Sequence, residues 1–391
     1  MEIKLGDLFE ISSGGTPLKS HPEYYGGNIP WVKTGDLKSK YLYKVDDYIT
    51  EEGLKNSSAK MCKEDTVLIA MYGATIGATT ILKMSACTNQ ACAAFKKNEK
   101  VMPEYLYYFL KSHKEKFIKD GVGGAQPNIS AGYLKNVKMN LIDMEKQKKI
   151  VEVLDAVLKI IDKRKKEKKD LDNLIKARFV ERFGDPVANT MKWPVKKLKD
   201  LSVKINSGNT PKGGAENYVE KGITFFRSQN VWKDRLEMED IVYIDEKTHE
   251  SMKRSSLKYG DILMTKTGRI NTENSSLGRA ALYWGKDDMA NVNGHVYFIR
   301  LKQEVNNRFI LRILVSPEYR DLIRNVCVGG IDKRQLNKEH IENFPIICPP
   351  SDMVDEYVEF VEKVDKSKVA VQKALDEAQL LFDSLMQEYF G

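Results

Sequence analysis

The sequence has few of the features that mark secreted, membrane-bound or fibrous proteins. Its five cysteines form no Cys-x-x-Cys pair, which argues against a zinc module and for a reducing compartment. We expect no signal peptide, and the longest uncharged run, 66–82, is too rich in Thr and Gly for a membrane span. With 26 Gly and 12 Pro in 391 residues, collagen-like and wholly disordered chains are excluded as well. We therefore expect a folded protein of the cytoplasm.

The usual signatures of catalysis are also absent from the sequence. There is no phosphate-binding loop, dinucleotide-binding glycine turn, His-Glu-x-x-His zinc motif or Gly-x-Ser-x-Gly nucleophile elbow. The five histidines are scattered. The stretch 343–346 (NFPI) matches only part of the Asn/Asp-Pro-Pro-aromatic loop with which amino-methyltransferases hold a base, because it lacks the second proline and the aromatic residue. We expect no catalytic residue, metal or cofactor on this chain.

What the sequence does contain is an internal repeat. The segment LGDLFEISSGGTP (5–17) returns as LKDLSVKINSGNTP (198–211). Later matches pair IPWVKTGDL with ITFFRSQNV, TNQACAAFK with VNGHVYFIR, and VERFG with the QEYFG that ends the chain. The chain is therefore two diverged copies of one unit, each a long mixed segment followed by a terminal segment of about 40 residues.

Each terminal segment is predicted to form a long α-helix. Apolar residues recur at heptad spacing over 144–183 and 352–389, and a glycine follows each segment. At about 1.5 Å per residue, each helix would be roughly 60 Å long. Residues 144–184 carry 13 basic and 8 acidic side chains, whereas residues 351–391 carry 4 and 10. Because opposite charges favour pairing, we expect an antiparallel coiled coil of these two helices.

The mixed segments are predicted to form two similar α+β domains. Short runs rich in Val, Ile, Thr, Tyr and Phe alternate with Gly, Asn and Ser clusters, which is typical of an irregular sheet with long loops. Helical periodicity covers 103–119 in the first copy and 307–325 in the second. The predicted order is a first domain (1–143), a first long helix (144–184), a second domain (185–350) and a second long helix (351–391).

Charge and composition favour a nucleic-acid partner without proving one. The chain has 63 Lys+Arg against 55 Asp+Glu, a formal net charge of +8. Basic side chains alternate with Tyr, Trp and amide side chains in Gly-rich loops, a mixture that neutralises phosphates and offers hydrogen bonds to base edges. Many proteins that bind no nucleic acid carry a similar excess, so composition alone leaves a pure assembly scaffold open.

The motifs and their order resemble the DNA specificity (S) subunit of type I restriction-modification systems. The resemblance covers the whole chain. It rests on Leu-x-Asp-Leu and Ser-Gly-x-Thr-Pro at the start of each copy, on Gly-Gly-Ala-Gln-Pro-Asn-Ile-Ser at 123–130, and on the helix used twice. The second copy departs from this pattern, since its loop at 329–336 has the sequence GGIDKRQL. We expect a similar position for that loop but different contacts.

The resemblance implies a non-catalytic DNA-recognition subunit with two target recognition domains. In this family each domain reads one half of a split, asymmetric site, and the paired helices set the gap and dock two methylase subunits. The implied partners are double-stranded DNA, two methylase subunits and, through them, restriction/translocase subunits, with no membrane. S-adenosylmethionine, ATP and Mg would be held by those partner subunits. A bipartite type II methylase–nuclease system and a self-contained DNA methyltransferase or nuclease remain alternatives.

The distribution of arginine separates the two predicted domains. Residues 1–143 contain no Arg, whereas residues 185–350 contain eleven. Arg pairs with guanine through two hydrogen bonds, and Asn or Gln pairs with adenine in the same way. We therefore expect the first domain to read bases through Lys and amide groups and the second to depend on Arg. The candidates are Lys33, Thr34, Asn89, Gln90, Gln126 and Asn128 in the first domain, and Arg227, Gln229, Asn230, Arg269, Asn271, Lys333, Arg334 and Gln335 in the second.

The glycines that open each copy allow two interpretations. Gly14 and Gly208 either let the backbone approach DNA phosphates or supply the positive φ that a turn requires. Neighbouring aromatic residues have a simpler role: Trp31, Phe225 and Phe226 occupy matching strand positions and are predicted core residues.

Overall fold

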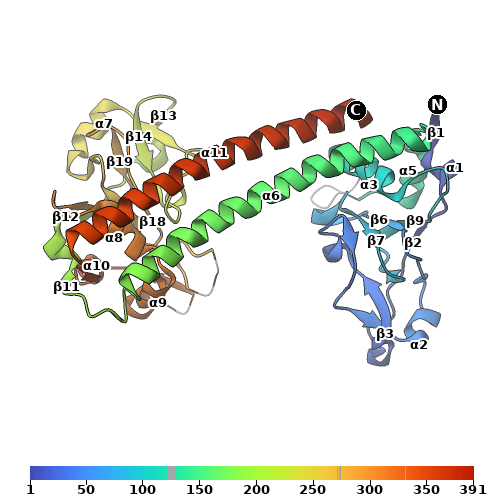
Figure 1. Ribbon diagram of the computed structural model, residues 1–391, viewed down its shortest axis with the longest axis horizontal. Coiled ribbons are helices and arrows are strands. Elements are labelled where there is room, and N and C mark those ends of the chain that lie inside the picture. Colours follow the sequence, from blue (N-terminus) through green and yellow to red (C-terminus); the bar gives the residue numbers. More distant parts are fainter. Residues whose placement is uncertain (122–127, 271, 273, 331) are drawn as a thin grey trace. The chain divides into compact units, whose positions relative to one another are not determined.

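The computed structural model describes residues 1–121, 128–270, 272, 274–330 and 332–391 (Figure 1). The chain divides into two compact units. Unit 1 is residues 1–167 with 370–391, and unit 2 is residues 168–369. Each unit therefore contains one α+β domain and part of both long helices, whereas the sequence-based boundaries assign a whole helix to each copy.

Unit 1 is organised around a five-stranded sheet with the order β2-β9-β6-β7-β4. Its neighbours are antiparallel except for the parallel pair β4 and β7. A three-stranded sheet (β5-β3-β8) and a two-stranded ribbon (β1-β10) complete the domain. The strands are β1 (Glu2–Lys4), β2 (Ile11–Ser13), β3 (Tyr25–Val32), β4 (Tyr41–Leu42), β5 (Tyr48–Ile49), β6 (Val67–Ala70), β7 (Thr79–Leu82), β8 (Cys87–Thr88), β9 (Cys92–Phe95) and β10 (Lys138–Asn140). The helices are α1 (Leu5–Leu8), α2 (Glu51–Lys55), α3 (Pro103–Ser112), α4 (Lys114–Asp120) and α5 (Ala131–Asn136).

Unit 2 repeats most of this plan, with four strands in its central sheet and with β13 as a fourth strand in its second sheet. The sheet β12-β20-β16-β18 corresponds to β2-β9-β6-β7, and β15-β14-β19 corresponds to β5-β3-β8, including the parallel third strand. Unit 2 also has a three-stranded sheet, β17-β22-β21; among the described residues of unit 1, an isolated antiparallel bridge between Tyr72 and Asn128 takes the corresponding position. The strands are β11 (Val195–Lys197), β12 (Ser202–Ser207), β13 (Tyr218–Val219), β14 (Ile223–Phe226), β15 (Val242–Ile244), β16 (Ile262–Thr265), β17 (Thr267–Arg269), β18 (Ala280–Leu282), β19 (Ala290–Val292), β20 (Val296–Leu301), β21 (Val328–Gly329), β22 (Lys333–Gln335) and β23 (Pro345–Ile347). The helices are α7 (Glu246–Ser251), α8 (Asn307–Leu314), α9 (Pro317–Val326) and α10 (Lys338–Glu342).

The two long helices, α6 (Met144–Phe183) and α11 (Ser351–Phe390), match the predicted segments and pack together in antiparallel fashion. In unit 1, Leu154 near the start of α6 shares a core with Phe382 near the end of α11. In unit 2, Phe179 near the end of α6 meets Tyr357 near the start of α11, with ring centroids 5.7 Å apart. The predicted antiparallel pairing is confirmed.

Charge pairs across the helices run in both directions in unit 2. Arg182 of α6 contacts Glu356 of α11 at 2.8 Å, as the charge sorting predicts. Lys368 of α11 contacts Asp172 of α6 at 2.7 Å, which is the opposite polarity. These surface pairs contribute little, so the shared apolar core, more than the charge difference, holds the helices together.

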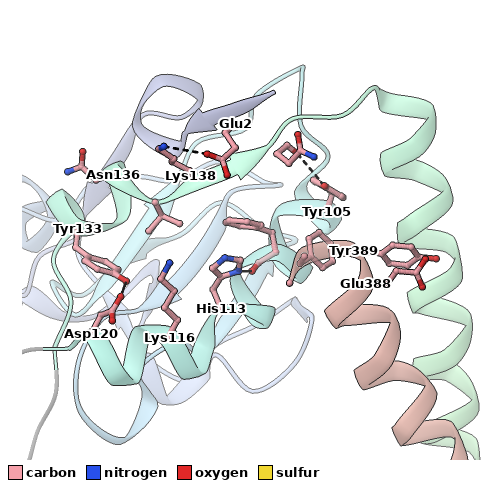
Figure 2. Close-up of a pocket in the computed structure, with 15 residues that line it drawn as sticks. Glu2, Tyr105, His113, Lys116, Asp120, Tyr133, Asn136, Lys138, Glu388 and Tyr389 are labelled. Atoms are coloured by element: carbon pink, nitrogen blue, oxygen red, sulfur yellow. Dashed lines mark hydrogen bonds and ion pairs between the residues drawn. The ribbon is translucent and has the colours of Figure 1, made fainter.

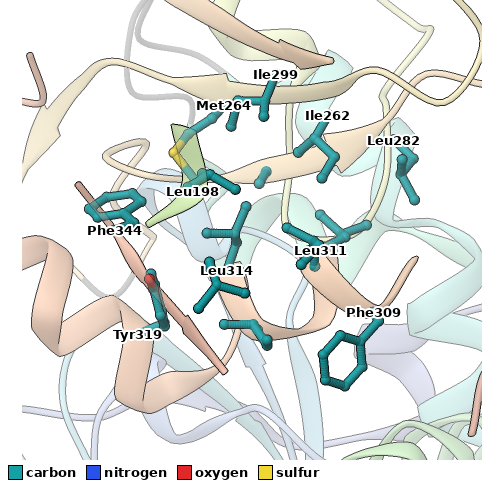
Figure 3. Packing of buried hydrophobic residues seen from close by; sticks show 14 of the residues in the cluster. Leu198, Ile262, Met264, Leu282, Ile299, Phe309, Leu311, Leu314, Tyr319 and Phe344 are labelled. Atoms are coloured by element: carbon teal, nitrogen blue, oxygen red, sulfur yellow. The ribbon is translucent and has the colours of Figure 1, made fainter. Parts of the chain in front are cut away.

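Each domain and the helix segments beside it share one hydrophobic core. In unit 2 this core joins the sheet, α8, α9 and both long helices. Figure 3 shows the part of it formed by the sheet, α8 and α9. Phe183 at the end of α6 is fully buried against Phe309 of α8, with centroids 5.0 Å apart in an edge-to-face arrangement. The predicted core residues Trp31, Phe225 and Phe226 are all buried. The domain is therefore fixed to the helices by packing, which holds its loops in a defined orientation.

The predicted helices at 103–119 and 307–325 are each broken into two. In unit 1 the break falls at His113, between α3 and α4. In unit 2 it falls at Val315 and Ser316, because Pro317 begins α9 and disfavours helical backbone in the residue before it. Apolar periodicity continues through both breaks, which is why a single helix was expected.

Candidate nucleic-acid interface

In unit 1, loops at one end of the central strands are tied together by backbone hydrogen bonds. The amide of Asn89 donates to Val32 (2.9 Å), that of Met71 to Ala91 (2.8 Å), that of Ile129 to Met71 (3.0 Å) and that of Gly15 to Thr88 (2.8 Å). We call this surface the loop face of unit 1. It comprises residues 13–17, 32–36, 71–75, 88–91 and 128–130.

Unit 2 builds the same surface with equivalent hydrogen bonds. The amide of Asn293 donates to Phe226 (2.9 Å), that of Lys266 to His295 (2.8 Å), that of Leu336 to Lys266 (2.9 Å) and that of Asn209 to Val292 (3.1 Å). The loop face of unit 2 comprises residues 207–211, 226–230, 266–269, 292–295 and 333–336. The four bonds match those of unit 1 one for one, so the repeat preserves the backbone frame of this surface.

The paired glycines hold this frame together by close backbone contact. A Cβ placed on Gly14 would lie 2.0 Å from the carbonyl oxygen of Thr88, and one placed on Gly208 would lie 2.0 Å from that of Val292. Neither glycine has a positive φ. A turn with positive φ is therefore not the reason for glycine at these two positions. Glycine is needed because the opening loop packs closely on the backbone at Thr88 in unit 1 and at Val292 in unit 2.

The sequence-predicted residues of unit 1 come together on its loop face. Lys33, Thr34, Asn89, Gln90 and Asn128 all belong to it, whereas Gln126 lies outside the described residues. The Lys33 ammonium contacts Asp47 at 2.5 Å and lies over the Trp31 ring, 5.7 Å from its centroid. Gln90 accepts a hydrogen bond from the Thr16 hydroxyl. The Oδ1 atom of Asn89 is buried, and no hydrogen-bond partner for it lies among the described residues.

Four of the residues predicted in unit 2 form one small sheet on its loop face. Arg269 on β17 pairs with Lys333 on β22, Gly268 pairs with Arg334, and Thr267 pairs with Gln335. Arg269, Lys333 and Gln335 are exposed, and Arg334 is partly buried. The Nε atom of Arg334 is buried, and the described part of the chain offers it no hydrogen-bond acceptor. Asn271 lies outside the described residues.

Arg227, Gln229 and Asn230 form a second group around Asp240. Arg227 makes an ion pair with Asp240 at 3.0 Å, and Gln229 donates to the same carboxylate. Asn230 is 1% exposed, and its side chain bonds the Arg227 amide (2.9 Å) and the carbonyls of Glu237 and Asp240 (both 3.2 Å). Asn230 therefore orients the loop that carries Arg227 and is not itself presented to a ligand.

Several loop-face residues were missed by the sequence reasoning. Lys266, Asn293 and His295 occupy the positions that correspond to Met71, Asn89 and Ala91. Matching of the repeats would have found Asn293, because its counterpart Asn89 was a candidate. Beside this face is a polar cavity of about 410 Å³, lined by residues 209–212, Asn217, Thr248, Ser251 and Met252.

A larger cavity of about 750 Å³ in unit 1 lies apart from the candidate residues (Figure 2). It is lined by β1, β10, α3, α4, α5 and the end of α11, including His113, Lys138 and Phe390. In unit 2 the corresponding position at the end of α6 is covered by Trp193, whose indole Nε1 donates to the Phe183 carbonyl at 3.1 Å. None of the described candidate residues for DNA lines the cavity of unit 1.

The described residues form no grouped metal ligands, and the 343–346 stretch is not placed to hold a base. No three His, Cys, Asp or Glu side chains among them are grouped so as to hold a metal ion. Phe344 and Ile346 of the 343–346 stretch are core residues, 2% and 0% exposed. No helix in this part of the chain has the length and apolar character needed to cross a membrane.

Comparisons with known proteins agree with the repeated architecture. The chain is 28% identical over 98% of its length to the type I restriction enzyme MjaIX specificity subunit of Methanocaldococcus jannaschii, covering 90% of that protein. It is 23% identical over 92% of its length to the StySPI specificity subunit of Salmonella potsdam, covering 80% of it.

Two solved structures share the fold over the whole chain. The S subunit of a type I system from M. genitalium matches with a TM-score of 0.56 at 14% identity, covering 96% of that chain. A chain from a structure on complex assembly in a type I system matches with a TM-score of 0.63 at 17% identity, covering 97%. The family model for the type I restriction modification DNA specificity domain matches twice, at residues 1–173 and 191–378. The family model thus matches each of the two copies of the repeat, and the chain belongs to the type I restriction-modification DNA specificity family.

Proposed function

We propose that the chain is the non-catalytic DNA-recognition subunit of a type I restriction-modification complex, in which each loop face reads one half of a bipartite, asymmetric site. The observation that carries this proposal is the pair of loop faces, which have equivalent backbone hydrogen bonds but differ in many of the side chains that the frame presents, throughout 32–36 and 226–230 above all. Two modules with one frame and different contacts suit a target with two different half-sites at a fixed separation.

Unpaired polar atoms on the two faces support a role in binding. In the described part of the chain, four buried side-chain polar atoms have no hydrogen-bond partner: Thr88 Oγ1, Asn89 Oδ1, Arg227 Nε and Arg334 Nε. All four belong to the loop faces. Buried polar groups are normally hydrogen-bonded, so such atoms are expected where a ligand supplies the missing partner.

The two faces differ in the hydrogen bonds they offer to bases. In unit 1, Lys33, Thr34, Asn89, Gln90, Gln126 and Asn128 supply an ammonium, a hydroxyl and amides. In unit 2, Arg269, Lys333, Arg334 and Gln335 on the small sheet act with Arg227, Gln229 and Asn271. An Arg with both ends of its guanidinium on guanine discriminates by about 1–3 kcal/mol against the wrong base. Asn230 has a positioning role, because its amide holds the Arg227 backbone.

The long helices are the proposed docking surface for two methylase subunits. Besides their shared core they expose apolar side chains, among them Val153 and Ile160 on α6 and Leu380 and Leu381 on α11, at 41%, 48%, 72% and 51% exposure. Exposed apolar side chains on a charged helix favour contact with another protein. Restriction/translocase subunits would join through the methylase. S-adenosylmethionine, ATP and Mg belong to those partners, and a cytoplasmic location stays a prediction.

Selection from random duplexes tests the proposal. The full chain, assembled with its methylase subunits, is incubated with a random duplex pool at moderate salt, and bound DNA is sequenced. We expect a split motif with a fixed gap. Arg334→Gln should relax selection in one half-site only, and Lys33→Gln should affect the other. Lys302→Gln, at the opposite end of β20 from the loop face, is the matched control and should leave both half-sites unchanged.

Three outcomes would contradict the proposal. Absence of any enriched motif would favour an assembly scaffold. Cleavage of DNA or binding of S-adenosylmethionine by the chain alone would indicate a self-contained enzyme. An Arg334→Gln variant that weakens binding to all sequences equally would show that Arg334 contacts phosphate and does not read bases.

A further inference from the structure

A cluster of basic side chains lies in unit 2 beside the loop face. It consists of Lys176 on α6, Lys233 and Arg235 after β14, Arg279 before β18, and Arg320 and Arg324 on α9. We call it the basic cluster. Lys176, Lys233 and Arg235 are exposed, and Arg320 and Arg324 are partly exposed. The cluster therefore combines four chain segments with solvent access.

The basic cluster is built on the Trp232 ring. The guanidinium carbon of Arg279 lies 3.9 Å from the ring centroid, and that of Arg235 lies 5.4 Å from it. Arg279 is 8% exposed, and its Nε donates to the Ser275 carbonyl at 3.0 Å. Stacking on an indole and bonding to backbone carbonyls fix these charges in place without neutralising them.

Acidic residues offset only part of this charge. Arg235 contacts Glu237 at 2.5 Å, and Arg324 contacts Asp321 at 3.1 Å. Asp234, in the same stretch of chain, pairs with the more buried Arg312 at 2.6 Å. Lys176, Lys233 and Arg279 make no ion pair with the described residues, so an excess of positive charge remains on these three side chains.

Burial and the neighbouring positive charges lower the pKa of Lys233. The pKa of Lys233 is lowered first by partial burial and then by Arg320, Arg279, Lys176 and Arg324. The pKa of Arg279 is likewise lowered by burial and by Arg320 and Arg235. Mutual repulsion of this kind destabilises the free protein, and a bound anion would relieve it.

The basic cluster is continuous with the loop face of unit 2. Arg320 donates to the Thr272 carbonyl at 3.4 Å, and Thr272 lies three residues beyond Arg269, which is on the small sheet. Arg320 therefore contacts the segment that continues from the small sheet of the loop face.

Unit 1 does not repeat the basic cluster at the matching positions. By the repeat, the positions of Lys233, Arg279, Arg324 and Lys176 are taken in unit 1 by Ser39, Ala78, Asp120 and Asp383. Only the position of Arg320 keeps a cation, as Lys116. Because the frame is the same in both units, the extra charge in unit 2 is not required for folding of the repeat.

We propose that the basic cluster binds the phosphodiester backbone of duplex DNA next to the half-site read by unit 2, so that the two domains grip DNA unequally. This inference rests on the proposed function. Backbone contacts of this kind contribute affinity and register without reading sequence. Unit 2 then supplies the salt-dependent anchor, and unit 1 contributes mainly through its loop face.

The test compares the salt dependence of two triple variants. The first replaces Lys176, Lys233 and Arg320 with Gln. The matched control replaces Lys199, Lys221 and Lys302, three exposed lysines of unit 2 outside the cluster, the loop face and the long helices, with Gln. DNA affinity of the complex with methylase subunits is measured by fluorescence anisotropy from about 50 to 200 mM salt. Circular dichroism and complex size are checked for each variant.

We expect the cluster variant to flatten the plot of log affinity against log salt by about 2–3 units, since each lost phosphate contact removes about 0.9. The selected motif should stay unchanged, and the control should keep the wild-type slope. Duplexes with neutral methylphosphonates on either side of the half-site should reproduce the loss on one side only.

Two results would overturn the inference. A cluster variant with the wild-type slope would show that these cations do not meet phosphate. A variant that fails to assemble with methylase subunits, while binding DNA as the wild-type chain does, would assign the cluster to an acidic protein surface. Both differ from failure of the proposed function, in which the wild-type complex selects no bipartite motif.

Discussion

The loop faces of units 1 and 2 share the opening Ser-Gly-x-Thr-Pro segment and the Asn89/Asn293 pair but differ at most other side chains, although their backbones bond alike. Met71 corresponds to Lys266, and Ala91 corresponds to His295, yet the backbone groups of all four make the same hydrogen bonds. Only backbone atoms and the packing glycines take part in this frame. Side chains at these positions can therefore change without loss of the fold, which is what a protein that must acquire new DNA targets requires.

One arrangement is shared by both faces. Lys33 in unit 1 and Arg227 in unit 2 follow matching strands, and each pairs with an Asp and lies near an aromatic ring. The ion pair restricts the rotamers that the cation can adopt. The exchange of Lys for Arg at this position illustrates how a face changes its hydrogen bonds while its geometry is kept.

The units also differ in how charge is used inside the domain. In unit 2, Arg300 makes two hydrogen bonds to Asp261, at 2.9 and 2.7 Å, and Asp261 is 1% exposed. In unit 1 the corresponding cation, Lys96, pairs with the exposed Glu10 at 2.6 Å. The same strand position thus carries a buried pair in one copy and a surface pair in the other.

The largest expected difference between the units is in the free energy of unfolding when the carboxylate of the Asp261–Arg300 pair or of the Glu10–Lys96 pair is removed. Asp261→Ala leaves Arg300 partly buried without its carboxylate and should lower the free energy of unfolding of unit 2 by about 3 kcal/mol. Glu10→Ala should change unit 1 by no measurable amount, because solvent already screens that pair. Hydrogen-exchange mass spectrometry during urea denaturation can follow β16 and β20 separately from β6 and β9. Equal losses in both units would contradict the comparison.

Replacing either of the paired glycines should destabilise its own unit, and the two losses of unfolding free energy should be equal. Gly14→Ala and Gly208→Ala each force a Cβ against a backbone carbonyl, so each should cost about 2 kcal/mol in its own unit and displace the opening loop. The same exchange measurement, with protection of residues 88–91 and 292–295 as the local readout, checks this prediction. Gly35→Ala, whose Cβ would meet open space, is the matched control. A large effect in only one unit would mean that the frames are not equivalent.

A smaller difference in stability is expected between the loops that follow β3 and β14, which carry Asp36 and Asn230. Asn230→Ala removes three buried hydrogen bonds and should cost about 1–2 kcal/mol, with weaker selection at the half-site read through Arg227. Its counterpart Asp36 accepts one bond from the Lys33 amide at 2.8 Å, so Asp36→Ala should cost less. Thermal unfolding and duplex selection measure the two consequences. Loss of stability with unchanged selection would remove Asn230 from any positioning role.

Much of the fold could be predicted because the repeat and the heptads are patterns of apolar residues. The bounds of α6 and α11 agree with prediction within a residue or two for this reason. The breaks at His113 and Ser316 were missed because apolar periodicity is insensitive to one interrupted turn. Pro317 was the available signal, and it was outweighed by the apolar pattern around it.

The candidate site was predicted less completely. Residue type and loop position brought most candidates to the loop faces, since loops between short strands gather at the same edge of a sheet. Residue type could not separate Asn230, which is buried, from Gln229, which is exposed. Asp240, whose backbone carbonyl bonds Asn230 and whose carboxylate bonds Gln229, lies ten residues beyond Asn230 and has no motif to mark it.

The smallest expected effect is a pH dependence confined to unit 1. Burial lowers the pKa of His113 below its usual 6.5 (Figure 2). Its hydrogen bond to the Phe109 carbonyl raises the pKa by a smaller amount, and Lys116 lowers it further. The unfolded chain therefore binds the proton more readily than the folded one, so this contribution to stability is lost as the pH falls below about 6.5. Unit 2 has Pro317 at the corresponding position and should lack the effect.

His113→Gln isolates this contribution from that of other titrating groups. Between pH 7.5 and 5.5 the wild-type unit 1 should lose up to about 1 kcal/mol more than the variant, whereas unit 2 should lose the same amount in both proteins. Hydrogen exchange in β6 and β9, compared with β16 and β20, separates the two units. If wild type and variant lose stability in parallel, His113 is protonated as easily in the folded domain as in the unfolded chain. The difference between the units at this position would then be one of packing alone.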